Sequence, residues 1–373
     1  MSDHHENFSS PRPATITLPS SFMTSPFCLR TTPYGGRGLF SIEPIPKDTL
    51  LVTCNSPYAT VIFRKFRKEV CGHCFAYAFD AHRNAWNVKY DGQAGNGVWF
   101  CGVDCRDVWA AEQNVEGLQG LMNAAVDKLA KSMKEPKVIL PYFLETMRPE
   151  DITLEVHDLA WKRIEDMYSR PGCLAPYLDE LEVDNVRFIV SAIVRRYFED
   201  TVPVKKGSSS WSALLQLQNN EIQHIRSRPY MLDSHTRIYG FLRKVMLPIL
   251  QPYVKTSEMV RAILARDQGN VFGLWDMSTT GDSEMLGWSM YVSGSYFNHD
   301  CAPNVRKERD KQALCFYTTR DVEAGEELCI NYVDVKDEVA QRRAELSANW
   351  YFDCACKRCH EELARAGKAV ACG

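Results

Sequence analysis

One segment in the last part of the chain restricts its fold more than any other feature. Residues 296–304 read YFNHDCAPN. Asn298 and His299 place hydrogen-bond donors and acceptors side by side behind two aromatic residues, and Pro303 stiffens the chain just beyond them. Alone, such a segment is most often a polar turn between two strands. Here it is followed by two further motifs, and the joint occurrence of all three is too specific to be a coincidence.

The two further motifs are a glycine-led strand pattern and a cysteine-rich tail. Residues 325–332 read GEELCINY, in which a glycine precedes two acidic residues and alternating apolar positions. This pattern predicts a turn that leads into a strand, with an ordinary hairpin strand as the alternative. Residues 354–359 read CACKRC, and three thiols so closely spaced predict metal ligands. One ligand is still missing from a tetrahedral set.

Length and composition are those of a globular protein with room for two or more domains. The chain has 373 residues, of which 45% are hydrophobic and 24% charged. Its net charge of −3 argues against a global basic field for nucleic-acid phosphates. The basic run at residues 64–68 is more simply a solvated face. No apolar run is long enough to span a bilayer, so neither direct nucleic-acid binding nor a membrane partner is expected.

The N-terminal region lacks the features of a signal peptide. Residues 1–26 are rich in Ser, Thr, Pro and His without an apolar stretch, so we expect a disordered tail there. The 14 cysteines are then expected in a reducing compartment, which predicts a nuclear or cytoplasmic location, or both. Clustered cysteines in such a compartment bind metal more often than they form disulfides.

A second group of cysteines is spaced for a metal. Cys71 and Cys74 form one short pair, and Cys101 and Cys105 form another after an aromatic-rich loop. Two such pairs supply the four thiolates that tetrahedral Zn²⁺ requires. His73 and His82 could compete as ligands, but surface histidines are the simpler interpretation.

The remaining segments read as a glycine-rich opening and a long helical region. Residues 34–40 read YGGRGLF, which predicts a turn into a strand whose backbone can approach a ligand closely. Apolar residues recur at helical spacing between residues 106 and 265, which predicts packing rather than a cofactor site. Helices are expected near residues 115–133, 152–168, 185–198, 211–226, 235–250 and 257–266. The strand pattern resumes at residues 270–275.

Together these segments resemble the SET domain family of protein-lysine methyltransferases, and within it the SET/MYND type, which carries an inserted MYND-like zinc finger. The resemblance is specific for the opening, the finger and the C-terminal motifs, and loose for residues 106–267. It implies an α+β fold: a SET β-fold with a pseudoknot, an inserted MYND-like zinc finger, a helical insert and a cysteine-rich post-SET tail. The short stretch after that tail looks most like the fungal branch of the family.

The resemblance implies an organisation along the chain. It consists of a disordered tail (1–26), the N-terminal part of the SET domain (27–66), a MYND-like finger with one site (67–110), a helical insert (111–267), the C-terminal SET core (268–335) and a post-SET zinc segment and tail (336–373). A full MYND finger interleaves a second metal site. The cysteines and histidine for that site are missing from this sequence, so one site is expected there.

The resemblance also implies an activity and the residues that carry it. The expected reaction is methyl transfer from S-adenosylmethionine to an exposed lysine of a protein substrate, histone or otherwise, with Tyr332 as the catalytic residue. The residues expected to bind the cofactor are Arg37, Asn270, Ser295, Asn298, His299, Tyr332 and Phe352. The expected ligands of two structural Zn²⁺ ions are Cys71, Cys74, Cys101 and Cys105 in the finger, and Cys301, Cys354, Cys356 and Cys359 in the tail. His360 is the reserve ligand if Cys301 points elsewhere.

Two positions depart from the family pattern. Gly35 stands where the family usually has a lysine, which removes one donor to the cofactor carboxylate. Trp350 aligns with a tyrosine of the substrate channel, and its larger side chain offers an N–H but no hydroxyl. An alternative function is therefore a catalytically weak SET fold that acts as a zinc-dependent protein-interaction module. A small-molecule or non-lysine acceptor is a third reading.

Overall fold

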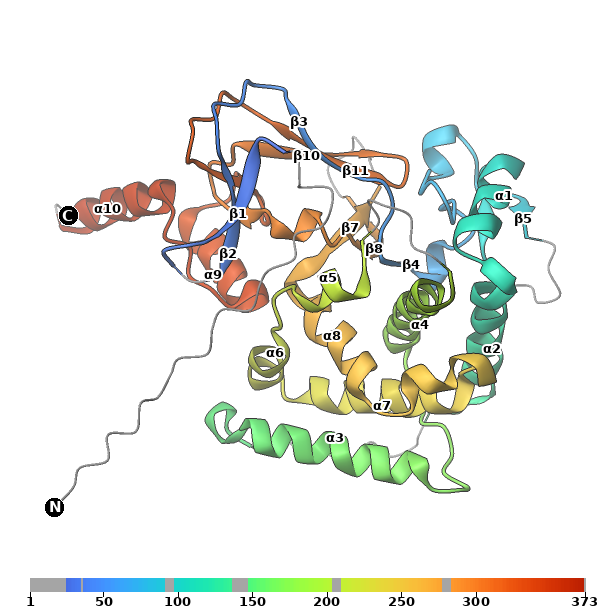
Figure 1. Ribbon diagram of the computed structural model, residues 1–373. Helices are drawn as coiled ribbons and strands as arrows, with labels where there is room; N and C mark the ends of the chain where they lie inside the picture. Colours follow the sequence, from blue (N-terminus) through green and yellow to red (C-terminus); the bar gives the residue numbers. More distant parts are fainter. Residues whose placement is uncertain are drawn as a thin grey trace, which may run out of the picture.

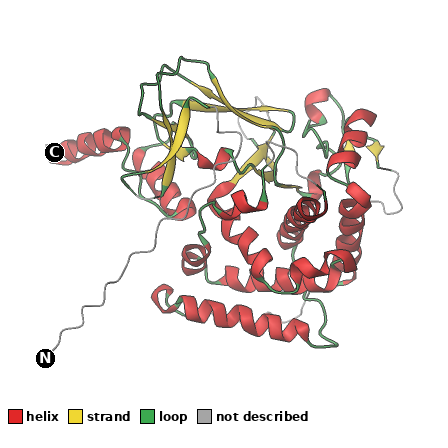
Figure 2. Ribbon diagram, in the orientation of Figure 1, coloured by secondary structure: helices red, strands yellow, loops and turns green. Residues whose placement is uncertain are grey.

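The protein is described by a computed structural model over residues 25–34, 36–90, 97–135, 147–202, 209–276 and 283–371. Most of the predicted tail (residues 1–24) and Gly35 lie outside these described residues. Figure 1 shows most of the strands gathered in one part of the molecule, with the long helices packed beneath and beside them. Figure 2 shows the same division by secondary structure.

Three small sheets form most of the β part. In spatial order they are β1 (Phe27–Thr31), β2 (Arg37–Ser41), β12 (Glu327–Ile330) and β9 (Asn298–His299); β10 (Val305–Asp310), β11 (Ala313–Thr318) and β3 (Leu50–Cys54); and β4 (Ala59–Ile62), β8 (Met285–Met290) and β7 (Val271–Trp275). Each sheet therefore joins strands from the two ends of the sequence, and the long segment between them is an insertion.

The pairing of β9 with β12 joins two of the motifs found in the sequence. The pair is parallel, with Asn298 opposite Cys329 and His299 opposite Ile330. The other edge of β12 pairs with β2, where Leu328 lies opposite Leu39. Strand β12 thus lies between the glycine-rich opening and the Asn298–His299 segment. This arrangement agrees with the predicted α+β fold, in which these two segments cross.

The predicted finger has a small core of its own. It contains β5 (Val88–Lys89), β6 (Trp99–Phe100) and α1 (Val103–Glu112). Trp86, Phe100 and Trp109 pack around Cys71 and Cys74 in a cluster separate from the main core. A cluster this small needs a further source of stability, which a bound metal can provide.

The insertion is helical, as predicted. Its helices are α2 (Leu118–Ser132), α3 (Leu154–Ser169), α4 (Glu180–Thr201), α5 (Trp211–Leu215), α6 (Glu221–Ser227), α7 (Tyr230–Val245) and α8 (Glu258–Asn270). Short 3-10 helices connect the elements: η2 (Arg64–Phe66), η3 (Phe79–Ala81), η4 (Val115–Gly117), η5 (Pro149–Asp151), η6 (Pro248–Val254) and η7 (Gly294–Tyr296). Helix α4 begins with a capping box between Asp179 and Glu182 and packs along β4, where Ser191 accepts a hydrogen bond from the Thr60 N–H.

The helix predicted over residues 211–226 is wrong in one respect, because it is two helices. Helix α5 ends at Leu215 and α6 begins at Glu221. The Asn219 side chain accepts a hydrogen bond from the Glu221 N–H, a local bond that competes with helix formation. The backbone N–H of Asn220 bonds to Ala265 of α8 instead of to its own helix.

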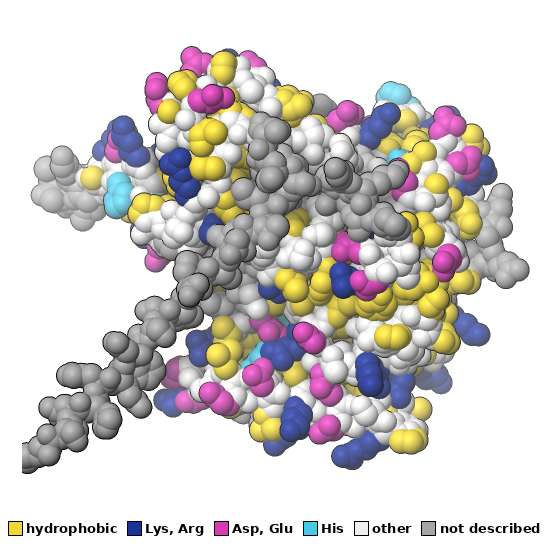
Figure 3. Space-filling view, viewed as in Figure 1, with side chains coloured by type: hydrophobic (Ala, Val, Ile, Leu, Met, Phe, Trp, Pro, Cys, Tyr) yellow, Lys and Arg dark blue, Asp and Glu magenta, His cyan; other side chains and the backbone are white. Residues whose placement is uncertain are grey.

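The C-terminal segment closes against the β part. It contains α9 (Val339–Trp350) and α10 (Lys357–Ala371), and α10 extends away from the body of the molecule (Figure 1). Figure 3 shows acidic and basic side chains interspersed over one face, with a band of hydrophobic side chains across it. None of the helices in the described residues combines the length and hydropathy needed to cross a bilayer. The boundaries given above for the domains stay predictions.

Gly287 on the central strand β8 provides a test of the sheet packing. A Cβ at this position would lie 2.1 Å from the Val61 carbonyl oxygen and 2.9 Å from Ile62 Cα, both backbone atoms of β4. We expect Gly287→Ala to lower the free energy of unfolding by about 1–3 kcal/mol, measured by urea denaturation. Gly273→Ala on β7 is the matched control, because its Cβ would meet only the exposed Trp275 side chain, which can rotate away. Equal losses in the two variants would contradict the packing.

Candidate functional site

The Asn298 side chain is held between the opening strand and β12. Its Nδ2 donates to the Arg37 carbonyl oxygen (2.9 Å) and to Glu327 Oε1 (2.8 Å). The Tyr34 hydroxyl donates to the same carboxylate at 2.6 Å. A Cβ on Gly38 would lie 2.2 Å from Glu327 Oε1 and 2.8 Å from Asn298 Nδ2, so this arrangement requires glycine. The sequence predicted Asn298 but missed Tyr34 and Glu327.

His299 connects the crossing strands to the tail. Its Nδ1 accepts the backbone N–H of Tyr332 (3.0 Å), and its Nε2 lies 3.2 Å from Cys301 Sγ. Because Nδ1 is an acceptor, the proton of the neutral ring is on Nε2, which donates to the sulfur. Burial, together with the nearby charges of Arg342 and Lys307, lowers the pKa of His299 to about 4. The imidazole is therefore neutral near pH 7.

The Tyr332 hydroxyl points into the protein. It donates to the Phe297 carbonyl oxygen at 2.7 Å, and burial raises the pKa of Tyr332 well above its usual value. The ring lies 5.5 Å from His299 and 5.4 Å from Trp350 between ring centres. Tyr332 thus presents a protonated hydroxyl beside an aromatic wall, where the sequence placed the catalytic residue and Trp350. Their roles stay predictions.

The end of α9 and the loop after it bring aromatic residues to this site from one side. The Phe352 ring centre is 6.3 Å from that of His299, and Trp350 faces Tyr332. Tyr351 lies between them with a left-handed backbone (φ 62°), and its hydroxyl is 2.6 Å from His224 Nδ1 on α6. The left-handed turn lets Tyr351 point toward the helical insert while its neighbours face the site.

The other side of the site comes from the α8–β7 junction and η7. Ser295 Oγ donates to the Asn270 carbonyl oxygen at 2.9 Å, and Asn270 Nδ2 donates to the carbonyl oxygens of Gln218 (3.2 Å) and Arg266 (2.9 Å). The Arg37 guanidinium donates to the Gln216 carbonyl oxygen. The structure therefore brings the predicted Arg37 and Asn270 to the segment between α5 and α6, and Ser295 bonds to Asn270 at the end of α8. Gly35 lies outside the described residues.

Asn220 is a polar residue at the site that the sequence did not reveal. Its Nδ2 donates to the Gln268 carbonyl oxygen at 3.0 Å, while its buried Oδ1 has no hydrogen-bond partner among the residues that the structure describes. A Cβ on Gly269 would lie 3.2 Å from Asn220 Nδ2 and 3.1 Å from Trp350 Cδ1, so both side chains lie beside Gly269. A buried acceptor of this kind calls for a donor that the described residues do not supply. The only signal in the sequence was an asparagine pair inside a helical pattern.

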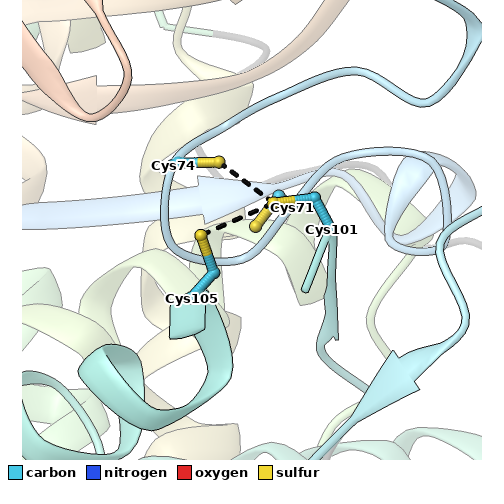
Figure 4. A group of neighbouring side chains, drawn as sticks. All are labelled: Cys71, Cys74, Cys101 and Cys105. Atoms are coloured by element: carbon cyan, nitrogen blue, oxygen red, sulfur yellow. Dashed lines mark hydrogen bonds between the residues drawn. The ribbon is translucent and has the colours of Figure 1, made fainter. Parts of the chain in front are cut away.

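The four cysteines of the predicted finger come together. Their sulfurs all lie within 4.8 Å of one another, and Cys101 Sγ is 3.6 Å from Cys74 Sγ and 3.5 Å from Cys105 Sγ. Figure 4 shows the side chains converging from the loop after η2, from the end of β6 and from α1. Neither His73 nor His82 belongs to the group. Four thiols so placed could hold a tetrahedral metal ion.

The four predicted cysteines of the tail also come together. Cys301 Sγ lies 3.5 Å from Cys359 Sγ and 3.9 Å from Cys354 Sγ, and Cys356 completes a group within 4.8 Å. Cys301 therefore belongs to the group, and the reserve ligand His360 does not. This group, like the finger group, has the four thiols that a structural Zn²⁺ site requires.

A buried cation lies beside the tail group. The Arg342 side chain is buried, and its Nε donates to Cys301 Sγ at 3.3 Å while Nη2 lies 3.8 Å from Cys359 Sγ. Nη2 also donates to Glu362 Oε2 on α10 at 2.6 Å. A guanidinium in this position favours thiolates over thiols. The sequence offered no motif for Arg342.

Comparisons with known proteins agree with this geometry. A family model for the SET domain matches residues 36–333. A yeast protein named potential protein lysine methyltransferase SET6 (Saccharomyces cerevisiae) is 30% identical over 365 residues, which cover 90% of this chain and 95% of the yeast protein. The chain belongs to the SET domain family, the family of protein-lysine methyltransferases that the sequence motifs predicted.

Two shorter similarities extend this assignment. A SET and MYND domain-containing protein of Dictyostelium discoideum is 34% identical over 106 residues, which cover 28% of this chain and 26% of that protein. The histone-lysine N-methyltransferase SET5 of Scheffersomyces stipitis is 38% identical over 77 residues, which cover 20% of this chain and 16% of that protein. Similarity to a SET and MYND protein, together with the two cysteine groups, confirms the predicted SET/MYND type.

Two histidines behind Tyr351 provide a pH test of the helical wall. His224 and His235 are buried and stacked at 5.9 Å, and burial lowers their pKa values to about 4 and about 3. In the unfolded chain both histidines have the ordinary pKa of about 6.5 and become protonated below that pH. The folded pKa values are lower, so stability from these groups is present above about pH 6.5 and is lost as the pH falls toward 4.

We therefore expect His235→Asn to flatten the acid loss of stability. Between about pH 6.5 and pH 5 each histidine contributes at most about 1.4 kcal/mol of unfolding free energy per pH unit. The measurement is urea denaturation of both proteins at several pH values. Parallel pH dependences for the wild type and the variant would contradict the buried, neutral state of His235.

Proposed function

We propose that this chain transfers a methyl group from S-adenosylmethionine to the ε-amine of a lysine in a protein substrate, with Tyr332 as the catalytic residue. The observation that carries the proposal is the β9–β12 crossing. In it, the segment of Asn298 and His299 lies beside Tyr332, whose N–H donates to His299 and whose hydroxyl donates to the Phe297 carbonyl oxygen. The alternative of a zinc-dependent interaction module is not favoured, because that role needs none of these polar contacts.

The residues around Asn298 fit the methyl donor. Its Nδ2 is used by the protein, and no described residue donates to its carbonyl Oδ1; Asn220 Oδ1 is a buried acceptor without a partner among the described residues. Such acceptors suit the amine and hydroxyl groups of the cofactor. Arg37, Asn270, Ser295, His299 and Tyr332 line the same region, and Phe352 offers a half-exposed ring for the adenine. When bound, S-adenosylmethionine supplies an electrophilic methyl group.

The chain's own groups prepare the acceptor. Burial keeps the Tyr332 hydroxyl protonated, so it remains a hydrogen-bond donor near pH 7, and the Phe297 carbonyl oxygen is the acceptor beside it. The Tyr332 and Trp350 rings, 5.4 Å apart, form an aromatic wall against which the substrate side chain would pack away from water. Removing water from a lysine amine lowers its pKa and favours the neutral form that can attack a methyl group. Orientation and desolvation are therefore the protein's contributions.

The two cysteine groups fit two structural Zn²⁺ ions. Both offer four thiols and leave no ligand position for water, which is typical of structural sites. The tail ion would tie Cys301, two residues beyond His299, to the loop that carries Trp350 and Phe352. Zinc in this position supports the cofactor site rather than the chemistry.

The substrate is proposed only by class. A histone is one candidate, because a relative that is similar over a short segment is named a histone-lysine methyltransferase. Other proteins with an exposed lysine are equally compatible with the site, and a nuclear or cytoplasmic location suits either. We propose no nucleic-acid or membrane partner.

A pair of substitutions separates binding from chemistry. We expect Tyr332→Phe to abolish methyl transfer while S-adenosylmethionine still binds, because the hydroxyl acts on the acceptor. Asn298→Ala is expected to weaken cofactor binding by about 1–3 kcal/mol, the cost of an unsatisfied buried group. Calorimetry measures the affinity, and transfer of a radiolabelled methyl group to histones and to a fungal lysate measures turnover. Unchanged cofactor affinity in Asn298→Ala, or full activity in Tyr332→Phe, would contradict the assignment.

Trp350 is expected to limit the number of methyl groups added. It is packed between the Tyr332 ring and Gly269, so little room remains for a lysine that already carries methyl groups. We expect slow monomethylation by the wild type and a higher rate or methylation degree in Trp350→Tyr. Trp350→Ala should leave a wet channel and lower the rate, because the amine is then less desolvated. Mass spectrometry of the product measures how many methyl groups the lysine carries. Efficient trimethylation by the wild type would place Trp350 outside the channel.

A further inference from the structure

Lys307 is an exposed residue of strand β10 that pairs across the sheet with a buried residue of β11. In the antiparallel β10–β11 pair, Lys307 lies directly opposite Phe316, and Arg309 lies opposite Leu314. Directly opposite residues project from the same face of a sheet, and Phe316 and Leu314 are both buried. Lys307 and Arg309 therefore project from the face of the sheet that also carries these two buried side chains, and both cations are themselves exposed.

The two cations have different partners. Arg309 is held by the Tyr291 hydroxyl (3.0 Å) and lies over the Phe75 and Tyr291 rings. In the part of the chain that the structure describes, no carboxylate lies within ion-pair distance of Lys307. The carboxylate of its neighbour Glu308 pairs with Arg306 instead. Arg309 thus has a structural role, whereas no ion pair holds Lys307 among the described residues.

The amine of Lys307 reaches the proposed acceptor region. Its Nζ donates to the carbonyl oxygen of Asn331 at 3.1 Å, one residue before Tyr332, and lies 5.9 Å from the centre of the Phe272 ring. Phe272 packs edge-on against Phe316 at 6.2 Å. The amine therefore lies over an aromatic surface and beside the strand end that carries the catalytic tyrosine.

The same aromatic surface continues to the Tyr332 hydroxyl. The Phe316 ring is stacked on Phe297 at 4.5 Å, and the Phe297 carbonyl oxygen accepts the Tyr332 hydroxyl. Although part of the Lys307 side chain is exposed, burial around the amine lowers its pKa below the usual value. The amine is thus partly prepared for the neutral state that methyl transfer requires.

We propose that Lys307 is a methylation site of this chain, modified in cis at its own active site. The inference rests on the function proposed above. In the step, Nζ gives up a proton to water and its lone pair forms a bond to the methyl carbon. The bond between that carbon and the sulfonium sulfur breaks, its electron pair stays on sulfur, and S-adenosylhomocysteine leaves. Because the fold already holds the Lys307 amine beside the site, no separate substrate has to bind for the transfer to occur.

The test uses the full chain with isotopically labelled S-adenosylmethionine, followed by peptide mapping by mass spectrometry. We expect label on Lys307 in the wild type, none in Tyr332→Phe, and none at this position in Lys307→Arg, which keeps the charge. Lys311→Arg is the matched control: Lys311 is the exposed lysine of the β10–β11 turn, and its replacement should leave the label on Lys307 unchanged. The fraction labelled per unit time should not change on tenfold dilution of the protein.

The outcomes separate this inference from the proposed function. Transfer to an added histone with Lys307 unmodified would overturn the inference and leave the function intact. A labelling rate proportional to protein concentration would show transfer between molecules and overturn modification in cis. No transfer to any protein, including the chain itself, would overturn both. Label on Lys307 without transfer to histones would support both and exclude only that substrate.

Discussion

The parallel pairing of two short strands is the contact on which the rest of the site depends. Strand β9 contributes Asn298 and His299, and β12 leads directly into Tyr332. The pair is extended by the Asp300 N–H, which bonds to the Ile330 carbonyl oxygen at 3.0 Å, and by the Tyr332 N–H, which bonds to His299. Because β12 also pairs with β2, the glycine-rich opening is brought to the same place. One crossing thus positions the predicted cofactor contacts and the predicted catalytic hydroxyl together.

The same crossing connects the site to the tail cysteines. Cys301 follows His299 by two residues and receives a hydrogen bond from it, so the thiol group and the imidazole share one short segment. Arg342 joins Cys301 and Cys359 to Glu362 of α10 and places a buried cation against the sulfurs. A metal at this group would therefore set the position of His299 and of the aromatic loop after α9, and through them the shape of the site.

Much of the fold and of the candidate site could be predicted from the sequence. The residues that the sequence did not reveal were missed for physical reasons. The eight cysteines, Asn298, His299 and Tyr332 lie in motifs whose spacing carries the information, and the helical region was evident from its apolar period. Tyr34, Glu327, Asn220 and Arg342 were missed because each is a single polar residue that acts through a partner far away in the sequence. The break between α5 and α6 was missed because a tertiary hydrogen bond from Asn220 outweighs helix propensity there.

The direct test of this account is the metal content of the purified chain together with its cofactor affinity. Native mass spectrometry of the full chain, purified without chelator, should show two Zn²⁺ ions. Cys356→Ser should retain the finger ion, lose the tail ion and lose measurable affinity for S-adenosylmethionine, because structural zinc contributes directly to the folding of its segment. A chain with no zinc or with three ions, or a Cys356→Ser variant that binds S-adenosylmethionine as the wild type does, would contradict a metal-supported cofactor site.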